Sequence, residues 1–316
     1  MPESPIGAVA VAGAPGHSRP AAGTRRAGTT RSGTTRSGDA PRSGQTSARL
    51  GRVLLWLAVA LGAAVMLFPF LWTVITSITP QANLSGGPSL IVNNPTLSAY
   101  AALFASVPVV RVVLNSFAVA AASTLLQLLT GSLAAYGFSR LAFKGKSFVF
   151  GCYLATLMIP LQVLVAPLFI MLTRMRLNDT YFALLAPNIA SAFGIFLLKQ
   201  AVDGVPKELD EAARLDGAGH LRIWAQVVMP LVRPAMAALI VFAFMESWNS
   251  FLWPLVAIRS PELMTLPLGL SYLQGQFTTD WNIVMAGSVV SILPIVVVYL
   301  FAQKHIIAGM AHTGLK

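Results

Sequence analysis

The amino-acid sequence predicts an all-α, polytopic membrane protein with six transmembrane helices. Of its 316 residues, 55% are hydrophobic and only 10% are charged, whereas about a quarter of the residues of an average soluble domain are charged. Uncharged runs such as residues 53–79 reach the roughly 20 apolar residues that cross a bilayer. Basic residues gather at the ends of these runs, which is typical of membrane topology.

The six predicted helices lie near residues 53–78, 112–138, 148–172, 181–198, 235–258 and 283–302. Helices are expected because lipid offers no partner for free backbone N–H and C=O groups. Strands of a membrane barrel would alternate polar and apolar residues, and these runs do not. The first run exceeds the apolar core of a signal peptide, so it is counted as a span.

Residues 1–50 differ in composition from the rest, with many Gly, Ser, Thr, Arg, Pro and Ala residues and the tandem GTTRSGTTRSG at residues 28–38. Such a segment has no apolar core to pack, so we expect a disordered, basic cytoplasmic tail. Binding of the tail to anionic lipid headgroups is an open alternative. Residues 51–316 are predicted to form one membrane domain.

The distribution of basic residues predicts that both termini are cytoplasmic. With that orientation, all 22 Lys and Arg residues except Arg111, Arg174, Arg176 and Arg259 lie inside, in accord with the positive-inside rule. The net charge of +11 therefore reflects topology and not a nucleic-acid patch, which would cluster basic and aromatic side chains.

No metal or redox site is predicted. Cys152 is the single cysteine, so a CxxC motif or an internal disulfide is excluded, and the four histidines form no HExxH pair. No catalytic triad can be proposed either.

After the first span, turn-forming residues lead to a short amphipathic patch with Tyr100 and Phe104 at an i, i+4 spacing. An extracytoplasmic helix at the membrane interface is expected here.

The loop after the fourth span predicts two short helices. Pro206 suits a first helical position, Glu208, Asp210 and Glu211 complement the positive end of a helix dipole, and Gly217 can supply a left-handed cap. A second helix is expected from His220. Alanines leave one flank of the first helix flat, where another protein can approach closely.

This loop resembles that of ATP-binding-cassette (ABC) importer permeases, whose pattern is E-A-A, three residues, Gly, nine residues, then I-x-L-P. The chain has Glu211, Ala212, Ala213 and Gly217, then V-V-M-P ending at Pro230. The resemblance implies that residues 211–216 form a coupling helix in a cleft of an ATPase subunit, with Glu211 facing a cationic group. We name residues 203–234 the coupling segment. Its implied ATPase-coupling residues are Glu211, Ala212, Ala213, Asp216, Gly217, Ala218 and Pro230.

From residue 53 to 316 the chain resembles, more narrowly, the second-type permeases of maltose-like and glycerol-phosphate-like importers. The markers are residues 115–148, WNSFLWPL at 248–255 and TLPLGL at 265–270. They imply a carbohydrate-type solute, moved by alternating access. The implied partners are a homologous second permease, two ATPase subunits, an extracytoplasmic solute-binding protein and lipid. A bacterial cell membrane is the implied location. The C-terminal tail departs from the family pattern at Met310, Ala311 and His312, which leaves a tail contact with the ATPase open.

A KGKS run at residues 144–147 is not a phosphate-binding loop, because Arg140 occupies the position of the first glycine and the run joins two membrane helices. We therefore expect no cofactor on this chain, no enzymatic activity of its own, and ATP and Mg²⁺ used only by partner ATPases.

Polar residues within the spans indicate a translocation pathway. Ser123 and Gln127 share one face of the second span, and Glu246 belongs to a polar stripe in the fifth, near Trp248 and Trp253. Intramembrane carboxylates usually face protein or water. The alternatives for Glu246 are a helix-packing hydrogen bond or a position near the outer interface. The predicted pathway residues are Ser123, Gln127, Glu246, Trp248 and Asn249.

The sequence leaves three other functions open: a secondary carrier driven by an ion gradient, an ABC permease for a non-sugar solute, or an integral membrane enzyme. A carrier would need several buried carboxylates, and an enzyme would need clustered catalytic residues. The identity of the solute stays open.

Overall fold

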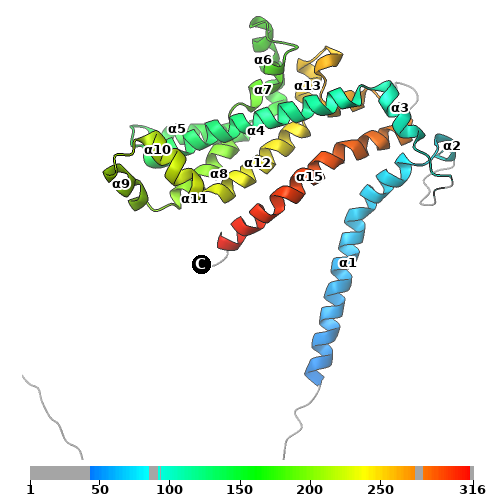
Figure 1. Cartoon of the computed structure of the whole chain (residues 1–316), viewed down its shortest axis with the longest axis horizontal. Helices are drawn as coiled ribbons and strands as arrows, with labels where there is room; N and C mark the ends of the chain where they lie inside the picture. Colours follow the sequence, from blue (N-terminus) through cyan, green and yellow to red (C-terminus); the bar gives the residue numbers. More distant parts are fainter. Residues whose placement is uncertain (1–42, 85–91, 93, 275–279, 314–316) are drawn as a thin grey trace, which may run out of the picture. The chain divides into compact units, whose positions relative to one another are not determined.

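A computed structural model describes residues 43–84, 92, 94–274 and 280–313. All the secondary-structure elements in this part of the chain are helices (Figure 1). The predicted disordered tail lies outside the described residues up to position 42. The chain divides into two units, residues 1–59 and 60–316. All packing described below lies within the second unit.

Most of the elements are shorter than a bilayer span. They are α1 Ser43–Ser77, α2 Gln81–Leu84, α3 Ser98–Ser106, α4 Val109–Arg140, α5 Lys146–Ala155, η1 Thr156–Met158, α6 Leu161–Arg174, α7 Tyr181–Leu185, η2 Ala186–Asn188, α8 Ala192–Asp203, α9 Glu208–Leu215, α10 His220–Ile223, the π-helical turn η3 Trp224–Val228, α11 Met229–Leu231, α12 Arg233–Trp248, α13 Leu252–Ala257, η4 Pro261–Leu263, α14 Leu266–Ser271 and α15 Trp281–Thr313.

Three helical stretches of the described chain are long and apolar enough to cross a membrane alone: Gly51–Ser77, Val109–Arg140 and Trp281–Leu300. Three bent pairs meet the same criterion when each pair is taken together: Lys146–Met158 with Leu161–Arg174, Tyr181–Asn188 with Ala192–Asp203, and His220–Leu231 with Arg233–Trp248. The all-α membrane fold is therefore confirmed. The count of six spans holds if each bent pair crosses once, and it stays a prediction.

The predicted third span is not one straight helix. Its two halves meet at an angle of 102°, with Pro160 between η1 and α6. Proline has no N–H to donate and its ring excludes the carbonyl of the preceding turn, so a sharp bend at this position has a direct cause.

The predicted fifth span, residues 235–258, is also wrong at its end, because α12 stops at Trp248 and a separate short helix, α13, begins at Leu252. The ring of Pro254 would clash with the carbonyl of Ser250 in a continuous helix. Asn249 and Ser250 therefore lie in the break and not on a helical stripe with Glu246.

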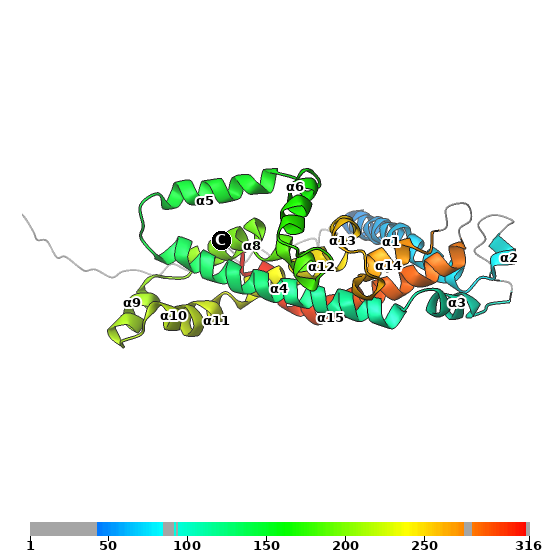
Figure 2. The ribbon, with the colours of Figure 1, turned by 90° about the horizontal axis from the view of Figure 1, so that it is seen from above.

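Helix α4 packs along α8 and α12 (Figures 1 and 2). Small residues permit the close approach: a Cβ on Gly131 would lie 3.7 Å from the backbone of Gly194, and a Cβ on Gly194 would lie 3.0 Å from Leu239. Thr130 donates a hydrogen bond of 2.9 Å to the Ile189 carbonyl. Small residues and hydroxyl bonds of this kind hold helices together where lipid supplies no hydrophobic driving force.

The two ends of α4 carry different neighbours. The end with Arg140 meets α9, α10 and α11, over a core that includes Tyr136, Ile223 and Met229. The other end meets α3 and α14, over a core that includes Leu103 and Leu266 (Figures 1 and 2). The predicted short helix after the first span is confirmed as α3.

Large apolar side chains cover the surfaces of α5, η1 and α6, where Phe148 is 75% exposed, Met158 85% and Val163 65%. A soluble monomer rarely shows so continuous an apolar surface. Contact with lipid or with another membrane subunit accounts for it.

Candidate functional site

The coupling segment forms the two predicted short helices. The first turn of α9 carries Glu208, Asp210 and Glu211, and Gly217 has a φ of +80°. Its N–H donates to the Arg214 carbonyl over 2.9 Å, so a residue without a Cβ closes the helix as expected. The second helix, α10, begins at His220. Pro206 lies outside α9, which begins at Glu208, because Lys207 takes the capping position.

One face of α9 is open to solvent in this chain. Glu211, Ala212, Asp216 and Gly217 are exposed, and Ala213 and Ala218 are half-buried. Leu215 is 91% exposed and Leu221, on α10, is 72% exposed. A groove of about 180 Å³ adjoins this face, lined by Ala213, Asp216, Ala218, Arg222, Gln226 and Val227. Carboxylates beside uncovered leucines suit a surface that another protein covers.

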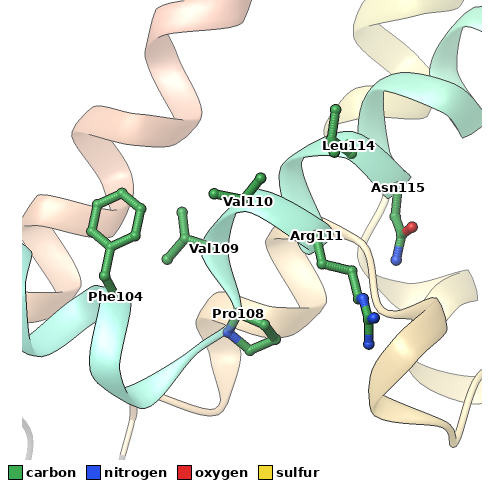
Figure 3. Close-up of a pocket in the computed structure, with 7 residues that line it drawn as sticks. All are labelled: Phe104, Pro108, Val109, Val110, Arg111, Leu114 and Asn115. Carbon is green, nitrogen blue, oxygen red and sulfur yellow. The ribbon is translucent and has the colours of Figure 1, made fainter.

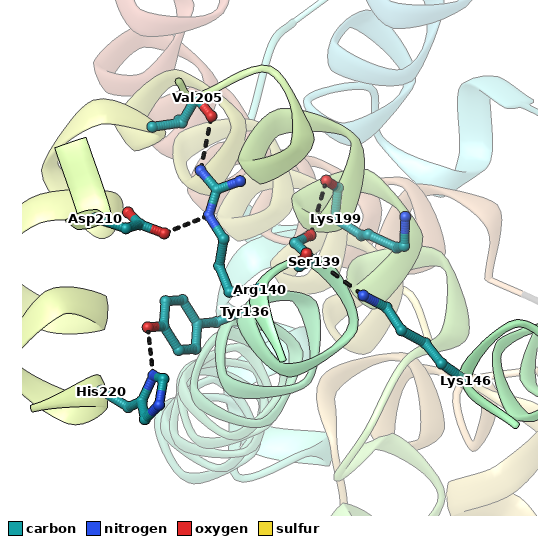
Figure 4. Close-up of polar contacts among 8 residues, drawn as sticks. All are labelled: Tyr136, Ser139, Arg140, Lys146, Lys199, Val205, Asp210 and His220. Carbon is teal, nitrogen blue, oxygen red and sulfur yellow. Dashed lines mark hydrogen bonds and ion pairs between the residues drawn. The ribbon is translucent and has the colours of Figure 1, made fainter. Parts of the chain in front are cut away.

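The other face of α9 is held by a buried ion pair. The Arg140 Nε atom lies 2.7 Å from Asp210 Oδ2, with the two side chains only 3% and 5% exposed (Figure 4). Arg140 Nη2 also donates to the Val205 carbonyl over 2.7 Å. From sequence alone Arg140 reads as a topology charge and Asp210 as a partner of the helix dipole. Neither pattern indicates that the two residues meet, because they lie 70 positions apart.

A second contact joins α10 to the same helix. The hydroxyl of Tyr136 lies 3.2 Å from Nδ1 of His220 (Figure 4). Tyr136 and Arg140 are four residues apart and thus on one face of α4. The last two turns of α4 therefore hold both helices of the coupling segment.

Pro230 belongs to the part of the coupling segment that packs inward. It is half-buried in α11 and stands next to Val228 and Met229, which join the core shared with α4 and α8. It is not on the exposed face with Glu211.

Two predicted pathway residues line one cavity. Gln127 on α4 and Glu246 on α12 both border a cavity of about 280 Å³. An adjoining cavity of about 220 Å³ shares Glu246 and Asn188 with it and adds Gln162 and Ser250. Gln127 is 2% exposed, whereas the Glu246 side chain is exposed on the isolated chain. The bend of the third span contributes Leu161 to both cavities.

Three other predicted pathway residues lie elsewhere. Ser123 is fully buried between helices. Trp248 is 1% exposed, stacks on Phe244 at 5.7 Å and donates its Nε1–H to the Ser291 carbonyl. Asn249 follows the end of α12 and donates to the Met245 carbonyl over 2.8 Å.

In this arrangement Trp248 has no free ring face for a sugar, so it serves helix packing. Trp253 is 2% exposed and donates to the Ala183 carbonyl over 2.8 Å. Trp253 borders the cavity of about 220 Å³, but its burial and its hydrogen bond to Ala183 fix its position.

A larger cavity of about 500 Å³ lies where α3 joins α4, lined by Phe104, Pro108, Val109, Val110, Arg111, Leu114 and Asn115. Figure 3 shows Arg111 and Asn115 projecting from the first turns of α4, with Phe104 on the far side of Pro108. It contains none of the predicted pathway residues.

Asn115 and Asp179 fasten the segment after α13 to the rest of the fold. Asn115 Nδ2 donates to the carbonyls of Glu262 and Met264 over 2.7 and 3.0 Å. Asp179 accepts hydrogen bonds from the Ser260 hydroxyl and from the N–H groups of Ser260 and Arg259. These bonds, with the Ser260 hydroxyl as the largest cause, lower the pKa of Asp179 below its ordinary value of 3.8.

Asp179→Asn is expected to lower the free energy of unfolding by roughly 1 kcal/mol at pH 7, since a carboxylate accepts these bonds more strongly than an amide. A folded-state pKa below 3.8 means that the stabilisation is present above that pH and disappears as the pH falls through the lowered value. Thermal unfolding at pH 7 and pH 3 measures it. Glu262→Gln, an exposed carboxylate on the same segment, is the control, and an equal loss for both variants would contradict the assignment.

A family model described as "binding-protein-dependent transport system inner membrane component" matches residues 127–312. The chain is 33% identical, over 84% of its length and 96% of the relative, to the arabinooligosaccharides transport system permease protein AraQ of Bacillus subtilis (strain 168). It is 34% identical, over 83% of its length and 96% of the relative, to the lactose transport system permease protein LacG of Rhizobium radiobacter. The permease protein UgpE of an sn-glycerol-3-phosphate transport system in Escherichia coli O157:H7 is 34% identical, over 79% and 92%.

Among solved structures, the fold is similar to a chain in the crystal structure of a bacterial ABC transporter involved in the import of the acidic polysaccharide alginate. The TM-score is 0.73, with 23% identity over 84% of this chain and 98% of that chain. This similarity concerns the fold.

Proposed function

Because the chain belongs to the family of binding-protein-dependent transport system inner membrane components, we propose that it is the permease subunit of an ABC importer for a carbohydrate or carbohydrate-like solute. The relatives' printed substrates are arabinooligosaccharides, lactose and sn-glycerol-3-phosphate. The proposed solute is accordingly a sugar, an oligosaccharide or a glycerol-phosphate type compound.

The observation that carries the proposal is the construction of the coupling segment. Its outer face presents Glu211, Leu215 and Asp216, and its inner face is locked to α4 by Arg140 and Tyr136. A force applied to the outer face is therefore passed to a helix long enough to span a membrane. A surface loop without a mechanical role needs neither the uncovered leucine nor the buried anchor.

The proposed cycle follows from that construction. Closure of an ATPase dimer moves α9, α9 moves the Arg140 end of α4, and the cavity bordered by Gln127 and Glu246 changes its access from one side of the membrane to the other. Gln127 and Glu246 border the proposed pathway. The chain supplies binding and movement, and it breaks no bond.

The proposed assembly contains a homologous second permease, two ATPase subunits that use ATP and Mg²⁺, and an extracytoplasmic solute-binding protein. The family description refers to the inner membrane, so a bacterial inner membrane is the proposed location. With the coupling segment facing cytoplasmic ATPases, both termini of a six-span chain lie in the cytoplasm, which agrees with the distribution of basic residues.

The test is reconstitution of the purified assembly in lipid vesicles, with and without the ATPase subunits. Uptake of radiolabelled sugars and ATP hydrolysis are measured together over a panel of sugars and sugar phosphates. Solute-stimulated hydrolysis and accumulation that need the ATPase support the proposal. Accumulation against a gradient without any ATPase, dissipated by an ionophore, would instead identify the rival secondary carrier.

Deletion of residues 2–45 is expected to leave uptake unchanged at equal protein levels, because neither the coupling segment nor the cavity includes these residues. Uptake per amount of membrane-inserted protein measures this. Loss of uptake at normal levels would assign the tail a role in transport.

A further inference from the structure

We infer that Glu246 makes the cavity that it borders with Gln127 reject anionic solutes, so that the importer carries an uncharged carbohydrate and not a sugar phosphate or a uronic acid. This inference rests on the proposed function and narrows the solute class. It concerns a point that the relatives leave open, since their printed substrates include neutral sugars and a phosphate ester.

The polar groups of the two adjoining cavities are amides, hydroxyls and one carboxylate. They are Gln127, Thr156, Gln162, Asn188, Ser191, Glu246 and Ser250. Among the residues that the structure describes, those that line these cavities include no Lys, Arg or His. Proteins that bind phosphate or carboxylate groups use guanidinium or ammonium groups or helix N-termini for that purpose. Amide and hydroxyl side chains instead match the hydroxyl groups of a neutral sugar.

Glu246 and Asn188 are available to a solute. Both border the two cavities, and Glu246 is exposed on the isolated chain. Within the described residues, the Glu246 carboxylate has no ion pair or hydrogen bond, whereas Asp203 and Asp210 each pair with a cation.

An unpaired carboxylate at the wall of a cavity acts on charged molecules at short range. Near a protein surface, two like charges repel several times more strongly than they do in bulk water. The hydroxyl groups of a neutral sugar can donate hydrogen bonds to the Glu246 carboxylate. A phosphate or carboxylate group in the same place is repelled by Glu246, and no cation compensates the repulsion.

The test measures the electrostatic potential of the cavity without requiring that the solute be known. Cys152, the single cysteine and exposed outside the cavity lining, is replaced by serine, and Asn188→Cys or Gln162→Cys is added. The complete assembly in lipid is then labelled with a cationic trimethylammonium-ethyl or an anionic sulfonatoethyl methanethiosulfonate. Each rate is divided by the rate of the same reagent with a free thiol.

With Glu246 present, the normalised rate of the cationic reagent is expected to exceed that of the anionic reagent about tenfold. The ratio should stay high in Glu246→Asp, fall to about one in Glu246→Gln and invert in Glu246→Lys. A thiol at Ser106, exposed at the end of α3, is the control and should give the same ratio in all four backgrounds.

A ratio near one with Glu246 in place, or a high ratio that survives Glu246→Gln, overturns the inference. The first result is what a cation of the partner permease paired with Glu246 would produce. Labelling does not require turnover, so failure of this inference is separate from failure of the proposed importer function, which is read from the dependence of uptake on the ATPase.

Discussion

Arg140→Ala is expected to abolish uptake and to lower the free energy of unfolding by about 3–5 kcal/mol, because it leaves the Asp210 carboxylate buried without a cation. The side chains of Arg140 and Asp210 are only 3% and 5% exposed, so bulk water does not solvate the Asp210 carboxylate in place of the lost guanidinium. The variant also removes the hydrogen bond from Arg140 to the Val205 carbonyl. The end of α4 then loses its hold on α9. Thermal unfolding in detergent and uptake in vesicles are the two measurements.

The matched control is Asp203→Asn. It breaks the Lys199–Asp203 pair, which is as short, at 2.6 Å, but 17% and 40% exposed, and an exposed pair is worth about 0–1 kcal/mol. A second variant, Arg140→Met with Asp210→Leu, removes both charges together and is expected to recover most of the stability. Uptake by this stable variant shows whether the ion pair itself is needed or only the packing between α4 and α9. Arg140→Ala with unchanged stability and uptake would contradict the anchoring role.

Glu211→Lys is expected to reduce solute-stimulated ATP hydrolysis by about tenfold or more, since reversing one charge of an interfacial pair costs several kcal/mol. Glu211 is exposed, so the free energy of unfolding should change by less than about 0.5 kcal/mol. The combination separates this variant from Arg140→Ala, because here the fold stays intact and only the contact with the ATPase is lost. Hydrolysis by the reconstituted assembly, with and without solute, is the measurement.

The control is Glu262→Lys, which makes the same charge reversal at another exposed residue. The Glu262 carbonyl accepts a hydrogen bond from Asn115, so this residue lies at the opposite end of α4 from the coupling segment. The control variant should leave coupling intact. Normal coupling in Glu211→Lys would mean that the exposed face of α9 does not bind the ATPase through this carboxylate. The docking surface would then have to rest on Leu215 and the adjoining groove.

Local chemistry accounts for the parts of the fold that the sequence predicts well. Apolar runs must become helices wherever lipid surrounds them, and α4 and α15 follow this rule. Gly217 closes α9 because its φ of +80° strains any residue that has a Cβ. These features depend on a few neighbouring residues, so they can be derived without knowledge of the remaining chain.

The interruptions of the spans were harder to predict. A proline within an apolar run can bend a helix slightly or break it, and neighbouring helices decide which occurs. Pro160 marks a bend of 102°, whereas Pro167 lies inside the continuous helix α6. The type of residue is the same, and only the surrounding packing distinguishes the two positions.

By itself, the sequence determined that the chain is helical and suited to a membrane, and that a short acidic helix stands ahead of a glycine cap in its fourth loop. Tertiary structure alone decided that Asp210 turns inward to Arg140 while Glu211 faces out, that Trp248 serves packing, and that Gln127 and Glu246 border one cavity. The physical reason is range: helix formation and capping depend on residues a few positions apart, whereas burial and charge pairing depend on residues that only the folded chain brings together.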